Sequence, residues 1–189
     1  MRAVPTPHIL GIAEPEERAM DDIELRRQLE RVHADCFGWA MACCRRDRDE
    51  AEEVLQTVYL TVLDGRARYG GRSTFRTWLF AVIRRTAISE RRKTWLRGLL
   101  LQREAGILAP EAIAPPDIET ERDSRCERLS HALDHLATRQ REILHLVFYQ
   151  ELTVDEAAAV MGVSVGSART HYARGKARLA VLIGDATNI

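Results

Sequence analysis

The chain has 189 residues, which is enough for one domain or two small ones. Its apolar fraction of 46 % excludes general disorder, and it contains no apolar run long enough to cross a bilayer. The formal net charge of zero would, taken alone, argue against a nucleic-acid-binding protein. Because no signal-peptide pattern is present, we expect a cytoplasmic protein that does not insert into membranes.

The distribution of charge along the chain contradicts the argument from the net charge. Residues 65–103 carry 11 basic residues against a single acidic one, a net charge of +10. Residues 169–189 add a net +3, from four basic residues and one acidic residue. The rest of the chain is net negative, and the two effects cancel. Because basic stripes are typical of nucleic-acid sites, this pattern favours two separate contacts with nucleic acid.

The first helix is predicted to follow an N-terminal arm. Residues 1–21 contain three prolines and no sustained periodicity, so we expect a mobile arm there. From Asp22, apolar residues recur every three or four positions, which indicates an amphipathic helix. Cys36 and Cys43 lie on its apolar stripe and are interpreted as small core residues. The chain has no Cys-x-x-Cys pair and no complete zinc-ligand set, so we expect no metal and no cofactor.

Two further helices complete a first domain, which we place at residues 22–93. One ends before Gly65 and carries glutamates in its first turn, where the helix dipole favours anions. The other begins after Ser73, a residue that can cap a helix. Phe75 and Trp78 lie on the apolar stripe of this third helix, so they are interpreted as core residues rather than as platforms for stacked bases.

Residues 94–124 are predicted to be a flexible linker. They contain three prolines and a run of acidic residues, and their periodicity is weak. The early piece from Trp95 to Leu101 is apolar. It either packs on the first domain or continues the third helix.

The second domain, placed at residues 125–185, contains the pattern of a helix-turn-helix. Thr153 and Glu156 match a capping box, Gly162 allows the chain to leave the helix, and Ser164 can cap the next one. In this layout the second helix lies in the major groove of DNA. The predicted contacts are its exposed polar residues, namely Ser167, Arg169, Thr170, His171, Arg174 and Lys176. With no strand signal anywhere, we predict an all-α chain of two small helical domains joined by the linker.

Both domains resemble a known family. The segments EAEEVLQTVYLTVL (Glu50 to Leu63) and YGGRSTFRTWLFAVIRRTAISERRK (Tyr69 to Lys93) resemble region two of sigma-70-type sigma factors. The unit from Thr153 to Leu179, with LATRQREILHLVFYQELT before it, resembles region four. The absence of a substantial domain between them points to the extracytoplasmic-function (ECF) group. The resemblance implies a subunit that binds bacterial core RNA polymerase and promoter DNA, and relatives are often held inactive by an anti-sigma protein.

The resemblance also implies roles for residues of the first domain. In that family the second helix docks on the polymerase, and the third helix with the loop before it opens the promoter. Tyr69, in the glycine loop, is the better candidate for stacking on a base. The implied polymerase contacts are Glu52, Glu53, Gln56, Thr57 and Leu60. The implied contacts with the melted promoter element are Tyr69, Arg84, Arg85, Ser89, Arg91 and Arg92.

The alternative function is a free-standing helix-turn-helix transcriptional regulator, because the C-terminal segment also resembles response-regulator-type activators. Such a protein would have a receiver or ligand domain with strands in its N-terminal half, where this chain has helices and a basic segment. An enzyme acting on nucleic acid would need clustered carboxylates for a metal. The candidates, Asp49 and the glutamates after it, lie where the helix dipole already accounts for them. We therefore expect no catalysis.

Overall fold

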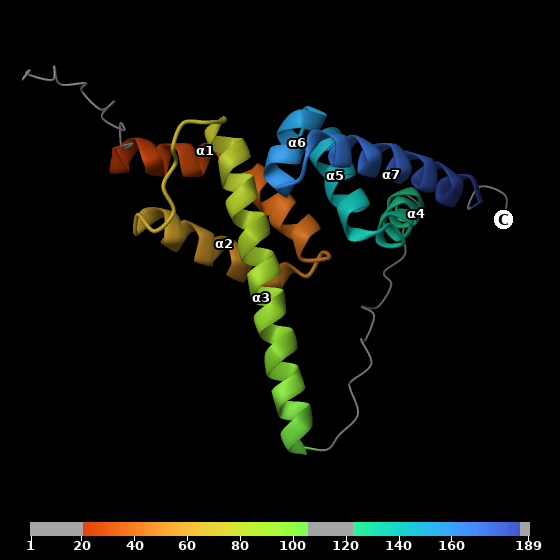
Figure 1. The fold of residues 1–189 in the computed structure, drawn as a ribbon, viewed down its shortest axis with the longest axis horizontal. Coiled ribbons are helices and arrows are strands. Elements are labelled where there is room, and N and C mark those ends of the chain that lie inside the picture. Colours follow the sequence, from red (N-terminus) through yellow and green to blue (C-terminus); the bar gives the residue numbers. More distant parts are fainter. Residues whose placement is uncertain (1–20, 106–122, 186–189) are drawn as a thin grey trace, which may run out of the picture.

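The computed structural model describes residues 21–105 and 123–185, and these residues form seven helices and no strand (Figure 1). The all-α prediction is therefore confirmed for the described residues. Residues 1–20 of the predicted arm and residues 106–122 of the predicted linker lie outside them. The helices are α1 (Asp22–Cys43), α2 (Arg48–Leu63), α3 (Phe75–Ala105), α4 (Asp123–Asp134), α5 (Thr138–Phe148), α6 (Val154–Met161) and α7 (Val165–Asp185).

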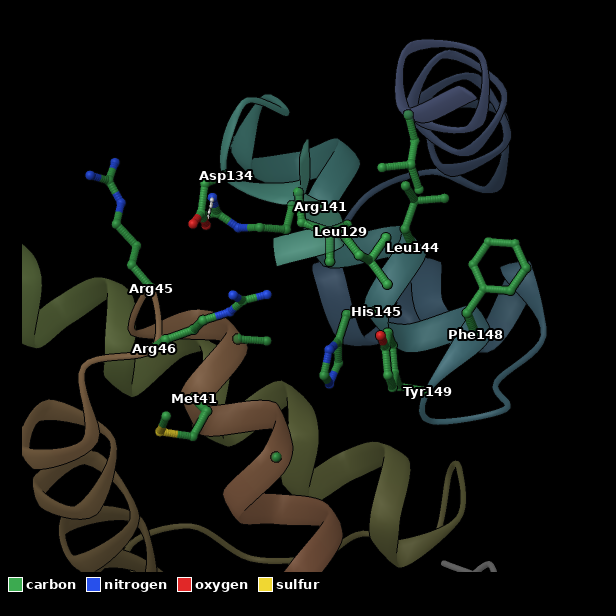
Figure 2. Close-up of a pocket in the computed structure, with 14 residues that line it drawn as sticks. Met41, Arg45, Arg46, Leu129, Asp134, Arg141, Leu144, His145, Phe148 and Tyr149 are labelled. Atoms are coloured by element: carbon green, nitrogen blue, oxygen red, sulfur yellow. Dashed lines mark ion pairs between the residues drawn. The ribbon is translucent and has the colours of Figure 1, made fainter. Parts of the chain in front are cut away.

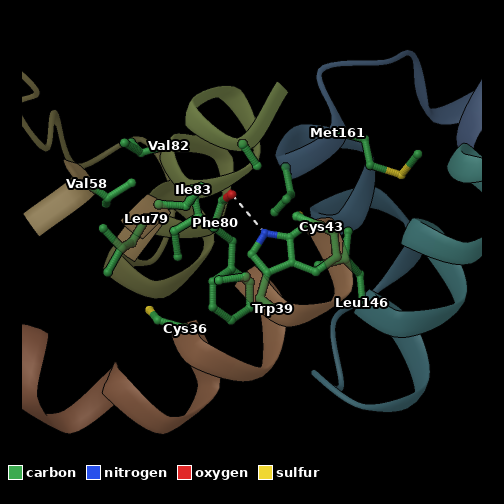
Figure 3. Packing of buried hydrophobic residues seen from close by; sticks show 14 of the residues in the cluster. Cys36, Trp39, Cys43, Val58, Leu79, Phe80, Val82, Ile83, Leu146 and Met161 are labelled. Atoms are coloured by element: carbon green, nitrogen blue, oxygen red, sulfur yellow. Dashed lines mark hydrogen bonds between the residues drawn. The ribbon is translucent and has the colours of Figure 1, made fainter. Parts of the chain in front are cut away.

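Helices α1, α2 and α3 pack together as the first unit. The apolar stripes read from the sequence face one another, which places Cys36, Val58 and Leu79 in the core (Figure 3). Trp39 of α1 is fully buried, and its indole Nε1 donates a hydrogen bond of 3.0 Å to the carbonyl oxygen of Phe80 in α3. This bond satisfies the one polar group of the largest core side chain.

Helices α4 to α7 form the second unit. Thr153 and Glu156 make the predicted capping box at the start of α6, and Gly162 ends α6 in the left-handed conformation with φ 64°. Helices α5 and α7 approach closely at Gly175, where an added Cβ atom would lie 3.3 Å from the Leu144 side chain. A larger residue at this position would push the two helices apart.

Helix α3 is longer than the predicted first domain. It continues through Ala105, so the predicted boundary between residues 93 and 94 falls inside a helix. The distal part of α3 extends away from the rest of the fold (Figure 1), and the Trp95 side chain there is 65 % exposed. The sequence left open whether this piece continues the third helix or packs on the first domain, and it continues the helix.

The two units share one apolar core, which the sequence did not predict. Helix α6 packs on α3, and α5 packs on α1. The rings of Trp39 and His145 lie with their centroids 5.5 Å apart across the boundary. Figure 3 shows Leu146 and Met161 of the second unit beside this core of the first. The described residues therefore form one packed body, in which the second unit closes over the first.

Candidate nucleic-acid interface

The predicted DNA-reading face of α7 lies on the outside of the second unit. Ser164 lies just before the helix, and its Oγ accepts a hydrogen bond of 3.2 Å from the backbone N–H of Ser167. Ala168 faces the core and Tyr172 is half-buried, so Arg169 and Thr170 between them turn outward. His171 is half-buried as well. The other five predicted contacts, Ser167, Arg169, Thr170, Arg174 and Lys176, are exposed.

Four of these five exposed side chains already have weak partners, and the hydroxyl of Ser167 accepts a hydrogen bond of 2.9 Å from that of Ser164. Arg169 lies 3.5 Å from Asp155 of α6, in a pair whose members are both mostly exposed. Lys176 lies over the ring of Tyr172, with its Nζ 4.7 Å from the centroid. Thr170 donates its hydroxyl to the carbonyl of Gly166 at 3.0 Å. Exposed contacts of this kind contribute little to the stability of the fold, so a phosphate or a base edge can replace them at a small cost in free energy.

The basic residues of α3 divide into two groups. Arg85, Ser89 and Arg92 are exposed, as a contact with nucleic acid requires. Arg84 and Arg91 are half-buried and are engaged inside the protein. The guanidinium of Arg91 donates to the carbonyl of Cys43 at the end of α1.

Arg84 contacts the second unit. Its Nε and Nη2 donate to Oε2 of Glu142 at 3.1 and 3.0 Å, and its Nη1 donates to the carbonyl of Met161 at 3.0 Å. The structure therefore brings one predicted DNA contact against α5 and the end of α6 instead of leaving it free.

Tyr69 is part of an aromatic cluster at the start of α3. Its ring centroid lies 5.5 Å from that of Phe75 and 5.6 Å from that of Trp78. Its hydroxyl donates to the carbonyl of Ser73, which pins the loop to the helix start. Phe75 is buried, as the sequence predicted, while Tyr69 and Trp78 are half-buried and keep part of their rings accessible.

A second surface lies on α2. Asp47 caps this helix, its side chain accepting from the N–H of Glu50 at 2.9 Å. Along the outward face, four of the five predicted polymerase contacts, Glu52, Glu53, Gln56 and Leu60, are exposed, and Thr57 is half-buried. Leu60 is 51 % exposed. An exposed leucine among acidic and amide side chains is suited to bind a protein partner.

Sequence reasoning missed the residues that join the two units. Glu142 and Gln150 are buried, although glutamate and glutamine are usually exposed. Arg76, which was not predicted as a site residue, donates to the carbonyl and Oε1 of Gln150 at 2.9 and 2.8 Å. No local pattern in the sequence marks these residues as buried, because their partners lie on helices far along the chain.

A pocket of about 510 Å³ lies between the units, lined by residues of α1, α4, α5 and α7 and of the turn after α1 (Figure 2). Met41 and Leu144 contribute apolar walls, and Arg45 and Arg46 lie at its edge. His145 is part of the wall, and burial lowers its pKa from 6.5 to about 4, with a smaller contribution from nearby Arg46. Its imidazole is therefore neutral at physiological pH.

Neither metal-ligand clusters nor accessible thiols occur among the side chains that the structure describes, where Cys36, Cys43 and Cys44 are buried. The described residues contain no group of three His, Cys, Asp or Glu side chains that could hold an ion. Burial raises the pKa of Cys36 to about 12 and that of Cys44 to about 11, so these thiols stay protonated and act as core residues. Among the described helices, none is long and apolar enough to cross a membrane.

Comparison with known families matches both units. Residues 29–97 match the family model described as Sigma-70 region 2, and residues 126–179 match the one described as Sigma-70, region 4. The RNA polymerase sigma factor CarQ of Myxococcus xanthus is 30 % identical over 153 residues, which cover 81 % of this chain and 86 % of CarQ. The ECF RNA polymerase sigma factor SigX of Bacillus subtilis is 28 % identical over 137 residues, 69 % of each chain.

Among solved structures, the fold is similar to that of the sigma factor RpoE in its co-crystal structure with the anti-sigma factor NepR from Bartonella quintana. The TM-score is 0.67, and the match covers 85 % of this chain and 97 % of RpoE. The sequence identity is 23 %, so this likeness concerns the fold.

Proposed function

The chain belongs to the sigma-70 family of RNA polymerase sigma factors, in its extracytoplasmic-function group. We propose that three of its surfaces have separate roles in directing promoter-specific initiation. The observation that carries the proposal is the separation of three polar surfaces, on α7, α3 and α2, that lie on the two matched regions. A free-standing regulator has no use for the region 2 match, so it is not favoured.

The α7 surface reads an upstream duplex element of the promoter. Helix-turn-helix proteins insert the N-terminal part of their second helix into the major groove. In this chain the second helix is α7, and its exposed face would enter the groove. Arg169 and Arg174 suit guanine edges, and Thr170 and Lys176 suit phosphates. Ser167 and His171 complete the reading face.

The α3 surface holds the melted promoter element. Arg85, Ser89 and Arg92 are exposed along one helix and would follow the phosphates of a single strand. Arg84 and Arg91 join them once they are released from their internal partners. Tyr69, at the edge of the aromatic cluster, would stack on an unpaired base.

The α2 surface binds core RNA polymerase through Glu52, Glu53, Gln56, Thr57 and Leu60. The chain contributes no catalysis to the complex, since the polymerase makes the RNA, and it acts in the cytoplasm. An anti-sigma protein is a further partner, as it is for RpoE of Bartonella quintana. Residues 94–124 join the two units, and the first part of this segment belongs to helix α3.

The test combines purified chain with bacterial core RNA polymerase and measures co-elution and run-off transcription on fragmented source DNA. We expect a stable complex that starts at discrete sites. Arg174→Ala should lower specific transcription by roughly 5- to 150-fold without changing co-elution, because a bidentate contact with a base contributes about 1–3 kcal/mol.

Arg178→Ala is the matched control, because it removes the same charge from an exposed position of α7 beyond the predicted contacts. It should leave the start sites and their strength nearly unchanged. Loss of polymerase binding in Arg174→Ala would contradict the division of labour, and sequence-specific DNA binding without any polymerase complex would support the free-standing regulator instead.

A further inference from the structure

The pocket drawn in Figure 2 is apolar over most of its wall. Its volume of about 510 Å³ lies within the range of roughly 300–1,000 Å³ that is usual for sites of small organic ligands. An alkyl chain would bury apolar surface here without leaving a polar group unpaired. The apolar side chains come from α1, α4, α5 and α7, and they are Met41, Leu129, Leu133, Leu144, Phe148 and Leu179.

The charged side chains of the pocket are mostly arginines, and they gather on one side of it. Arg45 and Arg46 extend from the turn after α1, and Arg141 projects from α5 toward the same side, while Phe148 lies on the opposite side (Figure 2). Asp134 is the one acidic residue among the described residues that line the pocket. Because the His145 ring is neutral, the lining carries a net charge of +2.

Arg141 is incompletely neutralised by the protein. Its side chain is 12 % exposed, and its Nη1 lies 3.7 Å from Oδ1 of Asp134, which is too long for a hydrogen bond. Its Nε is buried and finds no acceptor in the described part of the chain. Burial lowers the pKa of Arg141, Asp134 opposes this effect, and the charges of Arg45 and Arg91 add to it. Since a guanidinium stays charged in proteins, this environment favours a bound anion.

The turn that carries Arg45 and Arg46 holds both residues in the left-handed region, with φ of 54° and 67°. Glycine adopts this conformation without steric cost, whereas arginine does not. The turn is fixed by a hydrogen bond of 2.8 Å from the N–H of Arg46 to the carbonyl of Met41. Two cationic side chains therefore stand at the edge of the pocket where the backbone alone would favour glycine.

We propose that this pocket binds a small amphipathic anion, a single-chain carboxylate of the fatty-acid class. The alkyl chain lies along Met41, Leu133 and Leu144, and the carboxylate accepts hydrogen bonds from the guanidinium groups of Arg46 and Arg141. Arginine suits this role because its planar fork of donors matches a carboxylate. A nucleotide fits less well, since the apolar wall would leave the polar edges of its base unpaired. The site shares no residue with the three surfaces of the proposed function and does not rest on it.

The first test titrates the full chain, without polymerase, with decanoate below its micellar concentration and follows the heat by calorimetry. We expect one saturable site per chain. Decanol has the same tail without the charge, acetate has the charge without the tail, and decyltrimethylammonium has the opposite charge. Each should bind at least about tenfold more weakly, because it lacks either the charged hydrogen bonds or the buried chain. Equal binding of decyltrimethylammonium would mean simple adsorption of a surfactant and would overturn the proposal, as would no binding of decanoate.

The second test removes the charge that the proposal uses. Arg141→Gln should weaken decanoate binding about tenfold, because it removes hydrogen bonds from a charged group. Arg139→Gln is the matched control, because Arg139 is exposed on α5 and does not line the pocket, and it should bind like the natural chain. If Arg141→Gln loses its helical circular dichroism signal, Arg46→Gln, at an exposed position, should weaken binding about threefold. Unchanged affinity in a folded Arg141→Gln or Arg46→Gln chain would overturn the proposal.

The third test locates the ligand by nuclear magnetic resonance of chain labelled with ¹³C at the methionine methyl groups. Decanoate should shift the resonance of Met41, which lines the pocket, and leave that of Met161, which lies in a different cavity beside α3. Ala42→Phe places a ring in the pocket and should abolish both the shift and the heat of binding. A shift at Met161 with Met41 unchanged would place the ligand elsewhere and overturn the proposal. Since polymerase is absent from all three tests, their failure would leave the proposed function standing.

Discussion

At the scale of single residues, Trp39 connects the cores of the two units. It is fully buried, donates to Phe80 within the first unit and lies against His145 of the second. This residue was not singled out by the sequence pattern. The indole thus combines apolar burial with a satisfied polar group, which is the arrangement that makes a buried tryptophan favourable.

Trp39→Phe should lower the free energy of unfolding by about 2–3 kcal/mol, since it removes a buried hydrogen bond and leaves a cavity. The measurement is urea unfolding followed by circular dichroism. Trp95→Phe makes the same change at a side chain that is 65 % exposed, and it should change the free energy by less than about 0.5 kcal/mol. Equal effects of the two substitutions would mean that Trp39 is not the core residue described.

At the scale of helices, local rules predicted most of what forms. The apolar period located α1, α2 and the start of α3, and the capping box and Gly162 located the ends of α6. These features depend on neighbours in the sequence, so they can be read from it. The end of α3 was left open because Gly98 and the weak apolar pattern after Lys93 argue for neither helix nor loop.

Contacts between helices could not be predicted in the same way. Glu142 looks like a surface residue by type, and only the position of Arg84 explains its burial. Arg84 itself was predicted to face DNA, because a basic residue on a basic helix carries no sign of an internal partner. Exposed candidates such as Gln56 and Arg174 were placed correctly on the surface, and their roles stay predictions.

The capping box of α6 gives a prediction at this scale. Thr153→Ala should lower the free energy of unfolding by about 1 kcal/mol, because the N–H of Glu156 loses its side-chain acceptor. Hydrogen bonds from the Thr153 side chain and backbone lower the pKa of Glu156, so their contribution is present above its ordinary pKa of about 4.5 and is lost as the pH falls below it.

The comparison is best made by thermal unfolding at pH 7 and again at pH 3.5. The difference between natural and Thr153→Ala chains should shrink at the lower pH. Thr94→Ala, at an exposed position of α3, should show no such difference at either pH. A constant difference at both pH values would show that the carboxylate takes no part in the cap.

At the scale of the whole molecule, the interface between units is sensitive to the charge on His145. Its pKa is about 4 in the closed structure and 6.5 when free of burial, and Arg46, Tyr149 and Gln150 surround the ring. Because the pKa is lowered, the neutral ring is favoured. The stability that the neutral His145 ring contributes is fully present above pH 6.5 and declines as the pH falls toward 4.

Lowering the pH from 7.5 to 5.5 should therefore cost the closed structure about 1 kcal/mol through this one group. The free energy of unfolding in urea, measured at both pH values, should show this loss in the natural chain and a smaller one in His145→Gln. His135→Gln, at an exposed histidine, should keep the full loss. If His145→Gln retains all of it, another group must be responsible.

The covalent connection between the units also has a thermodynamic consequence. The chain from Ala105 to Asp123 runs through residues 106–122, and its contour length is at most about 60 Å. Each molecule thus confines its own second unit to a small volume around the first, equivalent to a local concentration of roughly millimolar order. An interface of only modest intrinsic affinity is then enough to keep the molecule closed. Expressed as two separate polypeptides at micromolar concentration, the same surfaces should largely dissociate, so the peptide backbone itself contributes to holding the two units together.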